Sequence, residues 1–101
     1  MKISLFCNAG MSTSLVAAKM KKYYEAQGKD YDVEAYDFSQ LLDEGDESDV
    51  IVLAPQVGWA YDDTVKDYPN AKVMALTLDQ FGSMNGEVVG KAVQQFIDSG
   101  K

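Results

Sequence analysis

The sequence predicts an α/β fold, a three-layer sandwich in which helices cover both faces of a four-stranded parallel sheet. Strand-like and helix-like segments alternate four times, which favours parallel strands joined by right-handed crossovers. In residues 49–54 an aspartate is followed by five apolar residues in a row, a pattern typical of the buried centre of a parallel sheet. With the first strand also central, the order is 2-1-3-4, and the topological switch point lies between strands one and three.

The first half of the chain predicts two strands and two helices. Residues 2–6 form the first strand, with a largely apolar run over residues 3–6. Apolar residues then recur at helical spacing from Ser14 until the helix ends near Gly28. Residues 31–36 alternate between apolar and charged side chains, which indicates an edge strand with one wetter face. A short helix follows, in which Phe38, Leu41 and Leu42 are the apolar residues, Ser39 lies near the start and Gly45 closes the helix.

The second half repeats the pattern. The central strand at residues 49–54 is stopped by a proline, and a third helix over 61–68 is ended by a Pro-Asn pair. Residues 72–76 form the fourth strand. A glycine-bounded loop spans residues 82–86. The last helix, around residues 89–97, has the best helical periodicity in the chain.

Composition indicates one domain spanning residues 1–101, and it excludes several function classes. The chain is 47% apolar and 25% charged, which is ordinary for a globular protein. No apolar run approaches the roughly 18 residues of a membrane span. The first residues enter a strand at once and show no secretory segment, and a single cysteine cannot form an internal disulfide. We therefore expect a cytoplasmic protein.

The charged residues narrow the chemistry further. A net charge of −7 argues against nucleic acid as a partner. All nine basic residues are lysines, so the chain has no histidine that would titrate near neutrality and no arginine fork for phosphate. No carboxylates show the spacing of metal ligands. We expect neither a metal nor a cofactor.

The only cysteine follows the first strand directly, in a loop of small residues that opens a helix. Backbone N–H groups and the helix dipole make such a place bind anions. They also favour the thiolate, so we expect the pKa of this thiol to lie below the value of roughly 8.5 for a free cysteine. A lone cysteine is often a core residue, but this one is predicted to lie in the loop. The candidate nucleophile is Cys7, and the candidate phosphate-binding residues are Asn8, Ala9, Gly10, Met11, Ser12, Thr13 and Ser14.

Ligands of open α/β sheets bind outside the carboxyl ends of the strands at the switch point. The loop at residues 7–14 and the segment at residues 55–58 both arrive there in the predicted topology. Two segments distant in sequence therefore converge on one pocket. Its predicted rim consists of Pro55, Gln56 and Val57.

The layout Cys-x5-Thr-Ser is similar to the Cys-x5-Arg-Ser loop of the low-molecular-weight tyrosine phosphatases, and it implies their fold. Thr13 stands where those enzymes have the arginine that clamps the phosphoryl oxygens. A hydrolase without this arginine is crippled. A carrier that must keep its phosphoryl group until an acceptor arrives gains from the same replacement.

The stretch Leu5–Leu15 closely resembles the phosphorylation loop of enzyme IIB in the lactose/cellobiose branch of the phosphoenolpyruvate-dependent sugar phosphotransferase system. Residues 54–57, Ala-Pro-Gln-Val, resemble the Pro-Gln segment of that family. Phe81-Gly82 and Asn85-Gly86 resemble its Tyr-Gly and Asp-Gly pairs, with phenylalanine for tyrosine and asparagine for aspartate. These two replacements leave a role for a hydroxyl or carboxylate there unsupported. The spacing agrees over residues 1–98.

The resemblance implies a two-step relay. A phosphohistidine on a separate IIA protein transfers its phosphoryl group to Cys7, and a sugar held by the membrane IIC component then receives it. The IIB protein is expected to associate peripherally with IIC. Sugar recognition belongs to IIC, which leaves cellobiose, chitobiose, lactose and aryl glucosides open.

Two other functions remain as alternatives. One is a hydrolytic phosphatase or arsenate reductase that uses Cys7; the other is a non-enzymatic module for anion binding or redox sensing. Among other residues, 43–47 are expected to be a solvated acidic loop, and Trp59 and Tyr61 to pack in the core, with a partner-facing rim as their alternative. A general-acid role for Asp79 is not supported, because no Asp-Pro signature accompanies it.

Overall fold

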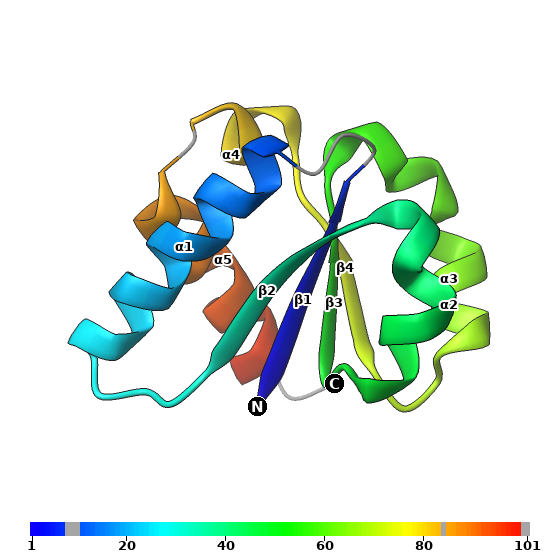
Figure 1. The fold of residues 1–101 in the computed structure, drawn as a ribbon, viewed down its shortest axis with the longest axis horizontal. Helices are drawn as coiled ribbons and strands as arrows, with labels where there is room; N and C mark the ends of the chain where they lie inside the picture. The colour runs from blue at the N-terminus through cyan, green and yellow to red at the C-terminus, as the bar shows by residue number, and fades with distance from the viewer. Residues whose placement is uncertain (8–10, 84, 100–101) are drawn as a thin grey trace.

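The computed structural model describes residues 1–7, 11–83 and 85–99. Four parallel strands form one sheet in the order β2-β1-β3-β4, which confirms the predicted topology. Helices α1 and α5 cover one face of the sheet, and α2 and α3 cover the other (Figure 1). The elements are β1 (Lys2–Cys7), α1 (Met11–Ala26), β2 (Asp32–Asp37), η1 (Phe38–Gln40), α2 (Leu41–Glu44), η2 (Gly45–Glu47), β3 (Val50–Leu53), η3 (Pro55–Ala60), α3 (Tyr61–Asp67), β4 (Lys72–Ala75), α4 (Leu78–Gly82) and α5 (Gly86–Asp98), where η marks a 3-10 turn.

The two central strands lie in the core, as their apolar runs predict. All four residues of β3 are fully buried, and β1 is buried from Ile3 to Cys7. The edge strand β2 alternates between the buried Val33 and exposed charged neighbours, because only one of its faces is covered. Side chains from both helical layers complete a single cluster of buried apolar residues.

The structure differs from the predicted elements in several places. Residues 43–47, expected to be a solvated acidic loop, form the end of α2 and the turn η2, and Gly45 is buried there. Strand β1 includes Cys7, which continues the parallel ladder opposite Asp37. Helix α1 begins at Met11, three residues before the predicted start. Helix α4 was not predicted, although Thr77 and Gln80 form the reciprocal side-chain caps of a helix start and are visible in the sequence as Thr-x-x-Gln.

Helices α1 and α5 pack closely, and a hydrogen bond from Tyr24 joins them. The hydroxyl of Tyr24, a fully buried residue of α1, donates to the backbone carbonyl of Gly90 in α5 at 2.8 Å. Burial of the ring raises the pKa of the Tyr24 hydroxyl, so this group stays protonated and acts as a donor. The bond therefore stabilises the α1–α5 layer over a wide range of pH.

We expect Tyr24→Phe to lower the free energy of unfolding by about 1 kcal/mol, the net contribution of a buried hydrogen bond of this kind. Denaturation by urea measures the change. The matched control is Tyr61→Phe, at a side chain that is 38% exposed, for which we expect a change within about 0.5 kcal/mol. Equal stabilities of the two variants would show that the Tyr24 bond contributes nothing.

Candidate functional site

Cys7 is the last residue of the central strand β1, and only 4% of its surface is exposed. The prediction that it lies in a loop outside the core is wrong: it pairs with Asp37 in the sheet and belongs to the buried apolar cluster. Because β1 extends by one residue to Cys7, its pairing with β2 continues to Asp37, the last residue of β2. The thiol is thus positioned by the rigid sheet, at the carboxyl edge where the chain leaves β1 for α1.

The rest of the predicted phosphate loop is only partly described by the structure. Asn8, Ala9 and Gly10 lie outside the described residues, and so do the side chains of residues 11–13. The backbone of residues 11–14 forms the first turn of α1, and Ser14 is exposed. The first turn of a helix has backbone N–H groups without intrahelical partners and a partial positive charge. In Figure 1 this end of α1 lies at the same edge of the sheet as the end of β1.

The segment after β3 reaches the same edge, as the predicted switch point requires. The backbone N–H of Ala54 donates to the carbonyl of Phe6 at 2.9 Å, so η3 begins beside the end of β1. Within η3, Pro55 is half-buried, Gln56 is exposed and Val57 is fully buried. Of the three predicted rim residues, Pro55 and Gln56 therefore face outward in part, whereas the side chain of Val57 packs in the core.

Trp59 and Tyr61 do not pack in the core, and the expectation that they do is wrong. Trp59 is 73% exposed and Tyr61 is 38% exposed. The 3-10 turn of η3 places the indole outside the sandwich, where its ring meets Phe38 edge-on with the centroids 5.5 Å apart. The sequence shows no periodicity over residues 55–60 that could have revealed that Trp59 faces solvent.

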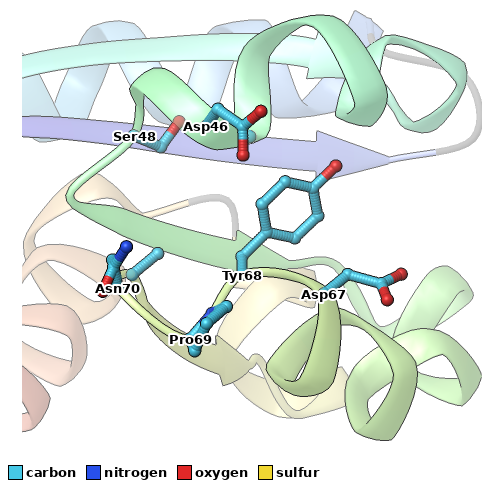
Figure 2. Close-up of a pocket in the computed structure, with 8 residues that line it drawn as sticks. Asp46, Ser48, Asp67, Tyr68, Pro69 and Asn70 are labelled. Atoms are coloured by element: carbon cyan, nitrogen blue, oxygen red, sulfur yellow. The ribbon is translucent and has the colours of Figure 1, made fainter.

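The cavity in Figure 2 lies where the chain enters β3 and β4, at the amino ends of these parallel strands, whereas Cys7 ends β1 at the carboxyl edge. It has a volume of about 180 Å³ and borders the segments that lead into β3 and β4. The carboxylates of Asp46 and Asp67 line it and help to raise the pKa of the Tyr68 hydroxyl, after burial of that ring. Carboxylates repel a phosphoryl group, so this cavity is not the phosphate site. Its lining residues are Gly45, Asp46, Ser48, Asp67, Tyr68, Pro69, Asn70 and Ala71.

A groove of about 240 Å³ runs between α1 and β2, from Ser14 past Lys21 to Glu34. Cys7 does not line it.

Within the three described stretches of the chain, no group of three or more His, Cys, Asp or Glu residues could hold a metal ion. None of the helices in those stretches is long and apolar enough to cross a membrane.

Comparison with known proteins agrees with this arrangement. Residues 2–92 match the family model described as the lactose/cellobiose-specific IIB subunit of the phosphotransferase system. The chain is 33% identical to the galactose-specific EIIB component of Lactococcus lactis subsp. cremoris, over 95% of both chains. It is 33% identical to the cellobiose-specific EIIB component of Lactococcus lactis subsp. lactis, again over 95% of both. It is 29% identical to the oligo-beta-mannoside-specific EIIB component of Bacillus subtilis, over 95% of this chain and 92% of the other.

Solved structures show the same fold. The cellobiose-specific IIB component from Borrelia burgdorferi superposes with a TM-score of 0.74 at 29% identity, over 97% of this chain and 89% of that one. The lactose-specific IIB domain from Streptococcus pneumoniae gives a TM-score of 0.81 at 15% identity, over 100% of this chain and 98% of that one. Members of this family act as sugar phosphotransferases together with IIA and IIC partners. The chain belongs to the lactose/cellobiose-specific IIB family of the phosphotransferase system.

Proposed function

We propose that residues 1–101 form a single IIB domain whose phosphoryl acceptor is Cys7. The observation that carries this proposal is the position of the thiol at the carboxyl end of the central strand, where the chain passes into the first turn of α1. A sulfur at this place has the positive end of a helix dipole nearby. The sheet holds it in a defined position, as a nucleophile that attacks in line requires.

In the first step the Cys7 thiolate attacks the phosphorus of a phosphohistidine on the IIA partner. A sulfur–phosphorus bond forms as the phosphorus–nitrogen bond breaks, and the electron pair of the broken bond stays on the donor imidazole. Backbone N–H groups of residues 9–14 would bind the three equatorial oxygens, with the hydroxyls of Ser12, Thr13 and Ser14 as further donors. The chain contains no histidine, so the donor imidazole must come from another protein.

In the second step the phosphoryl group leaves Cys7 for a hydroxyl of the sugar bound to the membrane IIC component. The new oxygen–phosphorus bond forms as the sulfur–phosphorus bond breaks, and the thiolate is regenerated while the sugar hydroxyl loses its proton. We propose a sugar of the cellobiose, chitobiose or lactose type, or a β-glucoside. The protein then acts on the cytoplasmic side, associated peripherally with IIC.

The test is phosphorylation in a reconstituted system. The full chain is incubated with phosphoenolpyruvate, the general phosphotransferase components and the IIA protein, and its intact mass is measured. We expect a gain of one phosphoryl group, located by peptide mapping in the segment that contains Cys7. A modified peptide elsewhere in the chain, or no gain, rejects the proposal.

A further prediction concerns the residue that replaces the phosphatase arginine. We expect Thr13→Arg to accelerate hydrolysis of the phosphorylated chain, because a guanidinium stabilises the charge on the phosphoryl oxygens in the transition state. A single well-placed donor of this kind is worth about 10²–10³ in rate. The measurement is the decay of phosphorylated chain in buffer without acceptor, with Thr13→Lys as the control for charge alone. An unchanged decay rate contradicts this account of the missing arginine.

A further inference from the structure

The excess of negative charge in this protein lies in one layer. Residues 38–68 contain eight of the 16 acidic residues and one of the nine lysines. This stretch therefore carries the whole net charge of −7, and the remainder, with eight acidic residues and eight lysines, is neutral. Apart from the buried strand β3, the stretch consists of α2, α3 and the 3-10 turns beside them. The layer that covers one face of the sheet is thus strongly acidic.

The same layer exposes large apolar side chains. Leu42 is 83% exposed and Trp59 is 73% exposed, the latter with its indole against Phe38. Tyr61 and Val65 are 38% and 41% exposed and lie one helical turn apart, on one side of α3. These four are half of the exposed large apolar residues found in the described chain. We name this surface the α2–α3 face; its members are Phe38, Leu42, Trp59, Tyr61 and Val65.

Two contacts hold the segments of the α2–α3 face together. The rings of Phe38 and Trp59 join η1 to η3, with a centroid distance of 5.5 Å. The hydroxyl of Tyr68, just after α3, donates to the backbone carbonyl of Leu41 in α2 at 3.1 Å. Figure 1 shows α2 and α3 on the same side of the sheet, turned away from α1 and α5. The exposed apolar residues thus lie on neighbouring segments that contact each other, η1 with η3 and α2 with the residue after α3.

We propose that the α2–α3 face is the surface with which this protein docks on the cytoplasmic face of its membrane IIC component. This inference rests on the proposed function. Cytoplasmic loops of membrane proteins carry an excess of lysine and arginine, which complements a layer with a charge of −7. Trp59, an exposed tryptophan on this acidic layer, is of the residue type that is enriched among interface anchors.

The same charges exclude direct binding to lipid as the basis of docking. The cytoplasmic leaflet is negatively charged and repels an acidic face, so attraction has to come from basic protein loops. The α2–α3 face also adjoins the carboxyl edge of the sheet, because η3, which carries Trp59, begins beside the end of β1. A protein seated on the α2–α3 face therefore reaches the edge where Cys7 lies.

The test measures binding without phosphoryl transfer. The full chain carrying Cys7→Ser is sedimented with inverted membrane vesicles that contain the cognate IIC component, and with vesicles from the same cells lacking it. We expect binding only to the first, and binding that weakens as salt is raised. In the same background we expect Trp59→Ser to weaken binding by about tenfold or more, as truncation of an interface anchor does.

A matched control and a second variant make the result decisive. Leu78→Ser removes a side chain that is 75% exposed but lies in α4, outside the α2–α3 face, and it should leave binding unchanged. Asp62→Asn combined with Asp63→Asn alters only exposed charge in the first turn of α3. We expect this pair to weaken binding about threefold and to reduce its dependence on salt; it serves as the test if Trp59→Ser does not fold.

Several results would overturn the proposal that the α2–α3 face docks on IIC. Equal binding to vesicles without IIC, or an effect of Leu78→Ser as large as that of Trp59→Ser, overturns the proposal. So does a phosphorylation of Cys7 by the IIA protein that is slower by more than about twofold in a Trp59→Ser chain that retains Cys7, which would assign the face to the donor. Failure of Cys7 to accept a phosphoryl group would reject the proposed function instead, and the sedimentation result would distinguish the two.

Discussion

Replacing Cys7 by serine is expected to abolish phosphoryl uptake from the IIA protein, with a loss of at least about a thousandfold in rate. A thiol is partly ionised near neutrality, whereas a serine hydroxyl is not, and the anion is the nucleophile. Stopped incubations with phosphoenolpyruvate, the general components and IIA, followed by intact mass, measure the rate.

The fold has to survive this substitution for the result to count. Cys7 is buried, so serine places a hydroxyl among apolar neighbours, and urea denaturation of the variant must accompany the assay. Cys7→Ala avoids the buried hydroxyl and provides a second variant without a nucleophile. If either folded variant still accepts a phosphoryl group at near the original rate, Cys7 is not the acceptor.

The second large effect is on stability, at the close approach of α5 to α1. A methyl group at Gly86 would lie 2.5 Å from the carbonyl carbon of Lys19 and 2.7 Å from the backbone nitrogen of Met20. Backbone atoms inside a helix cannot move aside as a flexible side chain does, so the helices must separate. We expect Gly86→Ala to cost about 3 kcal/mol in the free energy of unfolding, at the upper end of the range for overpacked cores.

Gly82 provides the matched control for this experiment. It ends α4, and a methyl group there would meet no atom within 4 Å. We expect Gly82→Ala to change stability by no more than about 0.5 kcal/mol, the range for surface substitutions. Urea or thermal denaturation of both variants gives the comparison. Similar stability of Gly86→Ala and the parent chain would mean that α1 and α5 are less tightly packed than the structure indicates.

Much of this protein was predictable from local patterns in the chain. The continuous apolar run of β3 and the alternating pattern of β2 correctly placed these strands at the centre and the edge of the sheet. The phosphorylation-loop motif alone indicates the family, because a functional loop preserves residue types at fixed spacing. The convergence of the segments after β1 and β3 followed from strand order alone.

Tertiary structure decided the features that depend on residues far apart in sequence. Cys7 belongs to β1 because Asp37, thirty residues later, extends the ladder, and nothing local to the cysteine reveals this partner. Trp59 lies outside because the turn of η3 directs it toward Phe38 instead of the sheet. Sequence by itself determined the fold, the family and the candidate nucleophile, since these depend on periodicity and motif. Burial and the α2–α3 face were decided by packing, because which atoms exclude water from a side chain depends on contacts between distant segments.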